Sequence, residues 1–145
     1  METKVKWTNG MEFTGAVGGH TVTLDSPAPL GKDQGFTPKQ LVAVGLAGCT
    51  AMDVIALLKK FRQPVDAFSV ELQTEPTQQG HPVVFAKANL VFKATGEIDK
   101  EKYLEAVRLS QTKYCGVSAM LAKALPIRYR VLLNDHEIGS GEANF

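Results

Sequence analysis

The feature that most constrains the fold is a long apolar segment at residues 37–60, TPKQLVAVGLAGCTAMDVIALLKK. Between Leu41 and Leu58, only Thr50 and Asp53 interrupt a run of apolar or small residues. A helix of about 22 residues is roughly 33 Å long, which is the width of a small domain. Because a helix that is apolar on nearly every face needs cover on all sides, the sequence predicts a buried central helix here.

Both ends of this segment carry helix signals. Thr37 is a suitable N-cap, Pro38 occupies the first helical position, and Gln40 completes a capping box with Thr37. Basic residues at the other end suit a helix C-terminus, and Pro64 prevents further continuation. The segment also reaches the lower length limit of a membrane span, but Asp53 and two glycines inside it favour the core of a globular protein.

Composition and charge narrow the function classes. Of the chain, 44% is hydrophobic and 21% is charged, as in ordinary globular proteins. The formal net charge of +1 gives no electrostatic basis for binding nucleic acid or an anionic membrane. The amino-terminal residues METKVKWTNG contain no apolar core of a signal peptide, so we expect a cytoplasmic protein. Two distant cysteines and three isolated histidines form no metal-binding spacing, so we expect no metal.

Alternating patterns predict strands on both sides of the helix. Asn9-Gly10 predicts a hairpin turn, and Gly18-Gly19 leads into a third strand. The glycine and proline content of residues 26–36 predicts a surface loop. Further segments follow: a second hairpin at 67–76 and 83–96, a helix at 100–113 capped by Asp99, a short helix starting near Cys115 or Gly116, and a strand at 127–134. The order β-β-β-α-β-β-α-α-β predicts an α+β fold in one domain, residues 1–145.

A single chain with this order offers little cover for the central helix. A second copy that packs its own central helix nearby would supply that cover, so we infer a homodimer with an extensive, mainly apolar interface. Gly45 and Gly48 are then sites where another helix or backbone approaches closely. The alternative is a monomer whose own sheet covers the helix.

The two cysteines are the candidate reactive groups. Cys115 lies near the start of a helix, where unpaired N–H groups and the helix dipole favour a thiolate. Cys49 lies in the middle of its helix and receives no such help, and Lys39 is about 15 Å away along the same helix. The alternative is that both cysteines are unreactive and serve only as small hydrophobic residues of the core. The spacing leaves open whether the two sulfurs meet.

Two segments resemble the OsmC/Ohr family. They are TPKQL with AGCTAM, at Thr37–Leu41 and Ala47–Met52, and YCGVSA at Tyr114–Ala119. The shared features are a proline-started central helix, a cysteine within it, and a second cysteine that opens a late helix. The resemblance covers nearly the whole chain. It implies an α+β fold with antiparallel sheets wrapped around long central helices in an intertwined homodimer.

The resemblance also implies a thiol-dependent peroxidase that acts on organic hydroperoxides without a metal or organic cofactor. On this hypothesis Cys49 attacks the peroxide oxygen and becomes a sulfenic acid. Cys115 then condenses with it to a disulfide, which an external dithiol such as a lipoyl protein reduces. Catalytic roles are therefore expected for Cys49 and Cys115.

The sequence departs from the family where the thiol is activated. The family uses an arginine from the amino-terminal strands, oriented by a glutamate at the start of the central helix. Here Lys39 and Gln40 occupy the helix start, and no arginine precedes Arg62. Lys39 of a second copy is a candidate for the missing charge, and His20 is a candidate donor. The alternatives are a solvated lysine and an ordinary strand histidine.

Three hypotheses follow. The first is a peroxidase of the OsmC type with altered tuning of the thiol pKa. The second is a dimer of the same fold that has lost peroxidase activity and binds a small hydrophobic or thiol-reactive ligand at the subunit interface. The third is a structural dimer whose cysteines belong to the core. The two cysteines favour the first over the third, and the absent arginine and glutamate favour the second over the first.

Overall fold

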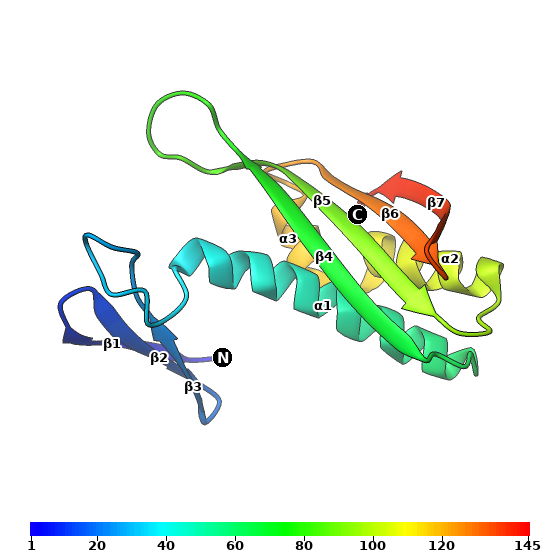
Figure 1. Cartoon of the computed structure of the whole chain (residues 1–145), viewed down its shortest axis with the longest axis horizontal. Coiled ribbons are helices and arrows are strands. Elements are labelled where there is room, and N and C mark those ends of the chain that lie inside the picture. Colours follow the sequence, from blue (N-terminus) through cyan, green and yellow to red (C-terminus); the bar gives the residue numbers. More distant parts are fainter. The chain divides into compact units, whose positions relative to one another are not determined.

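The computed structural model describes all 145 residues, and it confirms the α+β class (Figure 1). The chain forms two compact units, Met1–Val44 and Gly45–Phe145. The helix α1 (Pro38–Lys60) starts in the first unit and continues into the second. That these units make one domain over residues 1–145 stays a prediction.

The first unit contains a three-stranded antiparallel sheet with the order β1-β2-β3, which confirms the predicted meander. Its strands are β1 (Thr3–Asn9), β2 (Glu12–Val17) and β3 (His20–Leu24). The turn between β1 and β2 contains Gly10 at φ +49°, a conformation that glycine adopts without steric cost. Every residue of β1 is exposed, including the large apolar side chains of Val5 and Trp7.

The carboxylate of Asp25 organises the loop between β3 and α1. This buried side chain accepts hydrogen bonds from the backbone N–H groups of Ser26 at 2.7 Å, Lys32 at 3.1 Å and Gln34 at 3.1 Å. Hydrogen bonds to a carboxylate favour its charged form, so they lower the pKa of Asp25. The predicted surface loop at 26–36 is confirmed, and it leads directly into α1.

The start of α1 is the predicted capping box. The backbone N–H of Gln40 donates to Thr37 Oγ1 at 3.4 Å, and the Gln40 side chain accepts from the Thr37 N–H at 2.8 Å. Each side chain thus satisfies a backbone donor that has no partner within the helix.

The sides of α1 differ in burial. Its core side contributes the buried residues Leu46, Thr50, Val54, Leu57 and Leu58. Elsewhere Val44 is 53% exposed and Met52 76% exposed. Within this chain the helix is therefore only partly covered, and the choice between the homodimer and the monomer stays a prediction. The helix α1 is also long and apolar enough to cross a membrane. The core helix of a globular protein meets the same criteria of length and composition.

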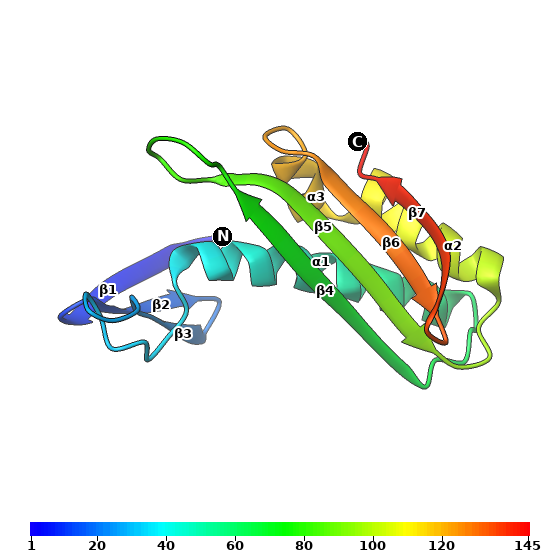
Figure 2. The same ribbon diagram turned by 45° about the horizontal axis from the view of Figure 1, so that its top comes forward.

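The second unit contains a four-stranded sheet with the order β4-β5-β6-β7 (Figure 2). Its strands are β4 (Ala67–Pro76), β5 (Phe85–Thr95), β6 (Ile127–Leu133) and β7 (His136–Glu142). The predicted hairpin of β4 and β5 and the late strand β6 are confirmed. Two details correct the sequence analysis: β5 pairs with β6 in parallel, so this sheet is mixed, and β7 is an additional strand at the end of the predicted order.

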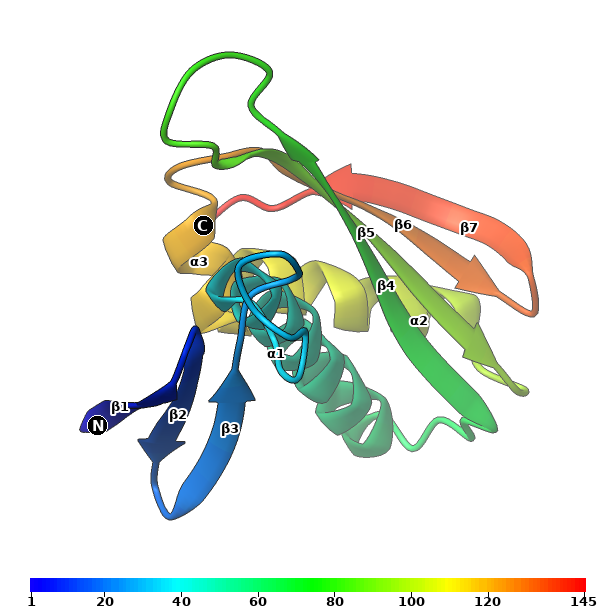
Figure 3. The ribbon, with the colours of Figure 1, turned by 60° about the vertical axis from the view of Figure 1, so that its left-hand side comes forward.

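Helices lie on one face of this sheet: the second half of α1, α2 (Lys100–Leu109) and α3 (Gly116–Leu121) (Figure 3). Along β5 the buried residues Ala88, Leu90, Phe92 and Ala94 recur at every second position, as expected when one face of a strand packs on a core. The core contains Leu90, Phe92 and Val131 from the sheet, and Val54, Leu58, Tyr103 and Val107 from the helices. This packing fixes α1 against the segment that joins α2 to α3, and the cysteines lie there.

Candidate active site

The first part of the site is one turn of α1. Cys49 and Asp53 are four residues apart, so they lie on the same face of the helix. Thr50 is fully buried beside them, whereas Cys49 and Asp53 are half-buried. The helix therefore presents a thiol and a carboxylate side by side at the edge of the core.

The second part of the site is the end of α2. The helix starts at the predicted cap, where Asp99 Oδ1 accepts the Lys102 N–H at 2.9 Å. Its α-helical part ends at Leu109, and the π-helical turn η1 (Ser110–Tyr114) follows. The Cys115 N–H donates to the Ser110 carbonyl oxygen at 3.0 Å, five residues back. Such wide turns are frequent at functional sites, and this one brings Ser110 and Gln111 into the interior.

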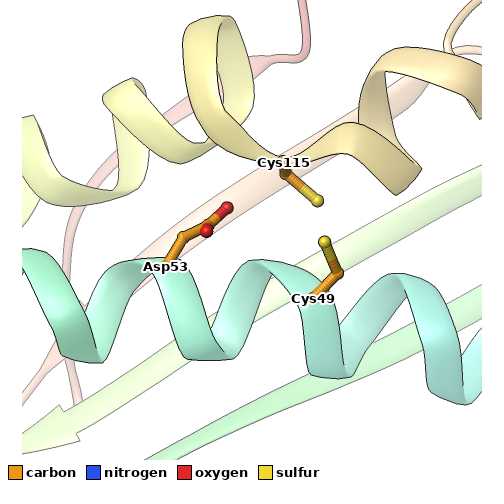
Figure 4. Close-up of side chains that lie close together, drawn as sticks. All are labelled: Cys49, Asp53 and Cys115. Carbon is orange, nitrogen blue, oxygen red and sulfur yellow. The ribbon is translucent and has the colours of Figure 1, made fainter. Parts of the chain in front are cut away.

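The two cysteines meet. Cys49 Sγ, Cys115 Sγ and a carboxylate oxygen of Asp53 all lie within 4.8 Å of one another. Figure 4 shows the two sulfurs pointing toward each other, from α1 and from the N-cap of α3, with Asp53 one turn along α1. Both thiols are free, and Cys115 is fully buried whereas Cys49 is half-buried. A molecule from solvent thus reaches Cys49 more easily than Cys115.

The environment of Cys115 differs from the sequence prediction. Its sulfur accepts the Ser118 N–H at 3.3 Å, which is the expected contribution of the helix start. Burial nevertheless raises the pKa of the Cys115 thiol, because it penalises the charged form; Ser118 offsets this in part, and Cys49 adds to the rise. The helix start thus lowers the pKa of the Cys115 thiol as predicted, but burial outweighs this contribution, and the net direction favours the neutral thiol.

A chain of buried hydrogen bonds ends on Asp53. The Ser110 hydroxyl donates to Asp53 Oδ2 at 3.1 Å and pairs with the Thr50 hydroxyl at 2.7 Å. Because the single Ser110 hydrogen goes to the carboxylate, Thr50 donates to Ser110. Gln111 Nε2 in turn donates to Thr50 Oγ1 at 2.6 Å. Every donor in this chain points toward the carboxylate, so the network holds Asp53 in place as an acceptor.

Ser110→Ala tests the importance of this network for the fold. The substitution leaves the buried Thr50 hydroxyl and one oxygen of Asp53 without their partner, so we expect a loss of about 1–3 kcal/mol in the free energy of unfolding. Urea denaturation followed by circular dichroism measures this loss. Ser69→Ala, which removes an exposed hydroxyl in β4, is the matched control. A Ser110→Ala variant as stable as this control would show that the network does not stabilise the fold.

The other predicted site residues lie in the first unit. Gln40 is exposed, and its side chain is engaged in the capping box of α1. Lys39 is exposed on the first turn of α1, ten residues before Cys49 on the same helix. His20 is exposed at the start of β3. Accessory roles for these three residues stay predictions.

Sequence analysis missed Asp53, Thr50, Ser110 and Gln111 as parts of the site. Thr50 and Asp53 were visible as the polar interruptions of the apolar segment, and the spacing of four between Cys49 and Asp53 was a usable signal. No local pattern indicated Ser110 or Gln111, because their inward position depends on the π-helical turn.

The cluster of Cys49, Asp53 and Cys115 has a spacing that a metal ion could bridge. Zinc would take two thiolates and a carboxylate oxygen, with a fourth position open. Metal binding requires deprotonated thiols, however, and burial favours the neutral thiol at Cys115. Because a coordinating metal itself deprotonates a thiol, this pKa direction does not decide between metal binding and thiol chemistry, and the absence of a metal cofactor stays a prediction.

The fold and the paired thiols define a class: an α+β protein with a two-cysteine site between a central helix and a late helix. Residues 31–130 match the sequence profile of the family described as "OsmC-like protein". The chain is also 36% identical over 131 residues to Protein YhfA of Escherichia coli (strain K12). The matched region covers 89% of this chain and 95% of that protein. The chain belongs to the OsmC-like family, which confirms the resemblance found in the sequence.

Solved structures share this fold. The OsmC-like protein from Mycoplasma pneumoniae superposes with a TM-score of 0.79 at 16% identity, over 91% of this chain and 95% of that one. An organic hydroperoxide resistance protein OsmC from Legionella pneumophila gives a TM-score of 0.64 at 15% identity, over 90% and 94% of the two chains. At these identities the likeness establishes the fold.

Proposed function

We propose that the protein is a thiol-dependent peroxidase that reduces organic hydroperoxides through a disulfide cycle between Cys49 and Cys115. The observation that carries this proposal is the meeting of two free thiols from distant segments, one half-buried and one fully buried. The Legionella protein of the same fold, named for organic hydroperoxide resistance, supports the choice of substrate.

The cycle follows from the different access to the two sulfurs. The Cys49 thiolate attacks one peroxide oxygen, the O–O bond breaks, and the alkoxide leaves as an alcohol after taking up a proton. Cys49 is then a sulfenic acid. Cys115, held beside it, displaces the sulfenic hydroxyl as water and forms the disulfide. An external dithiol, such as a lipoyl protein, reduces the disulfide to two thiols by exchange.

The proposed protein is a cytoplasmic homodimer that needs no metal or organic cofactor. The exposed side chains of Val44 and Met52 on α1, and of Val5 and Trp7 on β1, are apolar surface that a second copy would cover. The reducing cytoplasm suits a pair of thiols that must be regenerated in each cycle. Lys39 of a second copy remains a candidate for the positive charge near Cys49, and His20 remains a candidate hydrogen-bond donor.

A dimer of the same fold that binds a small hydrophobic or thiol-reactive ligand is the second candidate. It is favoured by the absence of an arginine before Arg62 and by the raised pKa of Cys115. Such a protein would still react through the half-buried Cys49 thiol, but it would not turn over a peroxide. The third hypothesis, two purely structural cysteines, accounts less well for the partial exposure of Cys49.

Consumption of cumene hydroperoxide by the reduced protein, with dihydrolipoamide as reductant, tests the proposal. We expect many turnovers per chain, and a higher kcat/KM for cumene hydroperoxide than for hydrogen peroxide, because apolar residues surround Cys49 on α1. Residual hydroperoxide is measured over time, with the dithiol alone as control. Consumption no faster than in this control would favour the ligand-binding alternative.

A further inference from the structure

We propose that Asp53 is the base and acid of the disulfide-forming step: its carboxylate takes the proton from Cys115 and gives it to the group that leaves Cys49. This inference rests on the proposed function for its biological setting. The step itself, attack of Cys115 on a modified Cys49, is chemically independent of the peroxide. It can therefore be tested on its own.

The need for a base arises from the burial of Cys115. Only the thiolate is nucleophilic, yet this sulfur is fully buried, and burial raises the pKa of its thiol. A neutral thiol in such a place must pass its proton to a neighbouring group as it attacks. The thiols and the carboxylate that meet at this point are those of Cys49 from α1, Cys115 from the start of α3, and Asp53 from α1. Since Cys49 is the group under attack, the carboxylate is the available acceptor.

The geometry suits this role. A carboxylate oxygen of Asp53 lies within 4.8 Å of both sulfurs, a distance that a single bridging water spans or a small side-chain movement closes. The hydroxyl of Ser110 holds the carboxylate in position by donating to Asp53 Oδ2. Burial raises the pKa of Asp53, and the Ser110 hydrogen bond partly opposes this rise. A carboxylate with a raised pKa is a stronger base than an ordinary one.

The atoms and electrons balance without another reactant. Asp53 removes the Cys115 proton, and the sulfur electron pair forms the bond to Cys49 Sγ. The S–O bond of the sulfenic acid breaks, and the departing hydroxide takes the proton from Asp53 to become water. Cys115 is oxidised, the sulfenic sulfur is reduced, and Asp53 returns to a carboxylate. The organic hydroperoxide that formed the sulfenic acid is the only oxidant.

The test uses 5,5′-dithiobis(2-nitrobenzoate) in place of a peroxide. This reagent couples to the half-buried Cys49 and releases one thionitrobenzoate; attack of Cys115 then releases the second. The rate of the second release measures the role of Asp53 as a base, because thionitrobenzoate leaves as a thiolate and needs no proton. For Asp53→Asn we expect this rate to fall about 100-fold at pH 7, the lower end of typical general-base contributions. Asp53→Glu, which retains a carboxylate, is expected to recover at least a tenth of the wild-type rate.

The pH profile separates a base from a residue that only shapes the site. With Asp53 as base, the wild-type rate is nearly flat around neutral pH and falls in acid, as the carboxylate takes up its proton. Without it, the rate follows the thiolate fraction of Cys115 and rises about tenfold per pH unit. We expect the flat profile for wild type and the rising one for Asp53→Asn.

Asp135→Asn, which removes the same charge from the exposed β6–β7 turn, is the matched control and should keep the wild-type rate and profile. A wild-type rate that rises tenfold per pH unit, or an Asp53→Asn rate within threefold of the control, overturns the inference. If the Asp53→Asn variant does not fold, the pH profile of the wild type alone tests the inference. If hydroperoxide turnover is absent while the second release behaves as expected, the proposed function fails and the role of Asp53 stands.

Discussion

Cys49→Ser is expected to abolish the catalytic consumption of cumene hydroperoxide, with a loss in kcat/KM of about 1,000-fold or more. The reason is that a serine hydroxyl is not an effective nucleophile toward the O–O bond, and removing the nucleophile removes the step that all others follow. Cys49 is assigned this role because its sulfur is half-buried, whereas Cys115 is fully buried. The measurement is the initial rate at several hydroperoxide concentrations.

Cys115→Ser is the matched comparison. This variant keeps the nucleophile and loses the partner that forms the disulfide, so we expect one rapid equivalent of hydroperoxide per chain. The product is a sulfenic acid on Cys49, which dimedone traps and mass spectrometry locates. Oxidised wild type should instead contain a disulfide between Cys49 and Cys115. Turnover that survives in Cys49→Ser and vanishes in Cys115→Ser would reverse the two roles.

The main elements of the fold could be predicted because their signals are local. Thr37, Pro38 and Gln40 mark the start of α1 within four residues, and the structure contains the hydrogen bonds that this pattern predicts. Asn9-Gly10 likewise marks the first turn. In these segments the backbone donors are satisfied by neighbours in the sequence, so the sequence alone identifies the partners.

The missed strand and the parallel pairing depend on longer-range contacts. The segment of β7, His136–Glu142, contains Gly139 and Gly141, which lower the intrinsic preference for a strand. What holds it is pairing with β6 across the Asn134-Asp135 turn. The parallel alignment of β5 and β6 requires the intervening helices to cross over the sheet. No alternation pattern in either strand specifies that alignment.

The residues of the candidate site likewise fall into those that local sequence patterns predict and those that depend on longer-range contacts. The two cysteines were recognised from their sequence contexts, and the structure brings their sulfurs together. The buried network behind them was not predicted, because Ser110 and Gln111 face inward only through the π-helical turn. The net rise in the pKa of the Cys115 thiol was not predicted for a related reason: the helix start is visible in the sequence, but the depth of burial is not.

In the proposed cycle, the thiols must be activated without the arginine and glutamate that the family resemblance led us to expect. The sequence indicated which residues were missing and offered Lys39 of a second copy and His20 as candidate replacements. The structure adds a carboxylate beside both sulfurs, together with a network whose donors all point toward it. A positive charge would stabilise a thiolate before attack, whereas a carboxylate removes the proton during attack. The two solutions predict different pH profiles, so they are distinguishable by kinetics.

Gly48→Leu is expected to break the proposed homodimer. Gly45, Gly48 and Met52 follow helical spacing and share one side of α1, where Met52 is 76% exposed. A Cβ atom built on Gly48 has open space around it, with no atom of another element within 4 Å, so we expect the monomer to accept the larger residue. If a second helix packs against these glycines, overpacking costs about 1–3 kcal/mol and raises the dimer dissociation constant roughly 5- to 150-fold. Sedimentation velocity over a range of concentrations measures this constant.

Gly48→Ala is the graded control, because it adds a single methyl group and favours the helix by about 1 kcal/mol. We expect its dissociation constant to lie between those of the wild type and Gly48→Leu, and circular dichroism should show the helix content unchanged in both variants. A leucine variant that remains as dimeric as the wild type would exclude close helix approach at Gly48. A monomeric wild type would exclude the dimer itself, and the exposed apolar side of α1 would then require a different partner, since burying that surface is the reason for proposing a second copy.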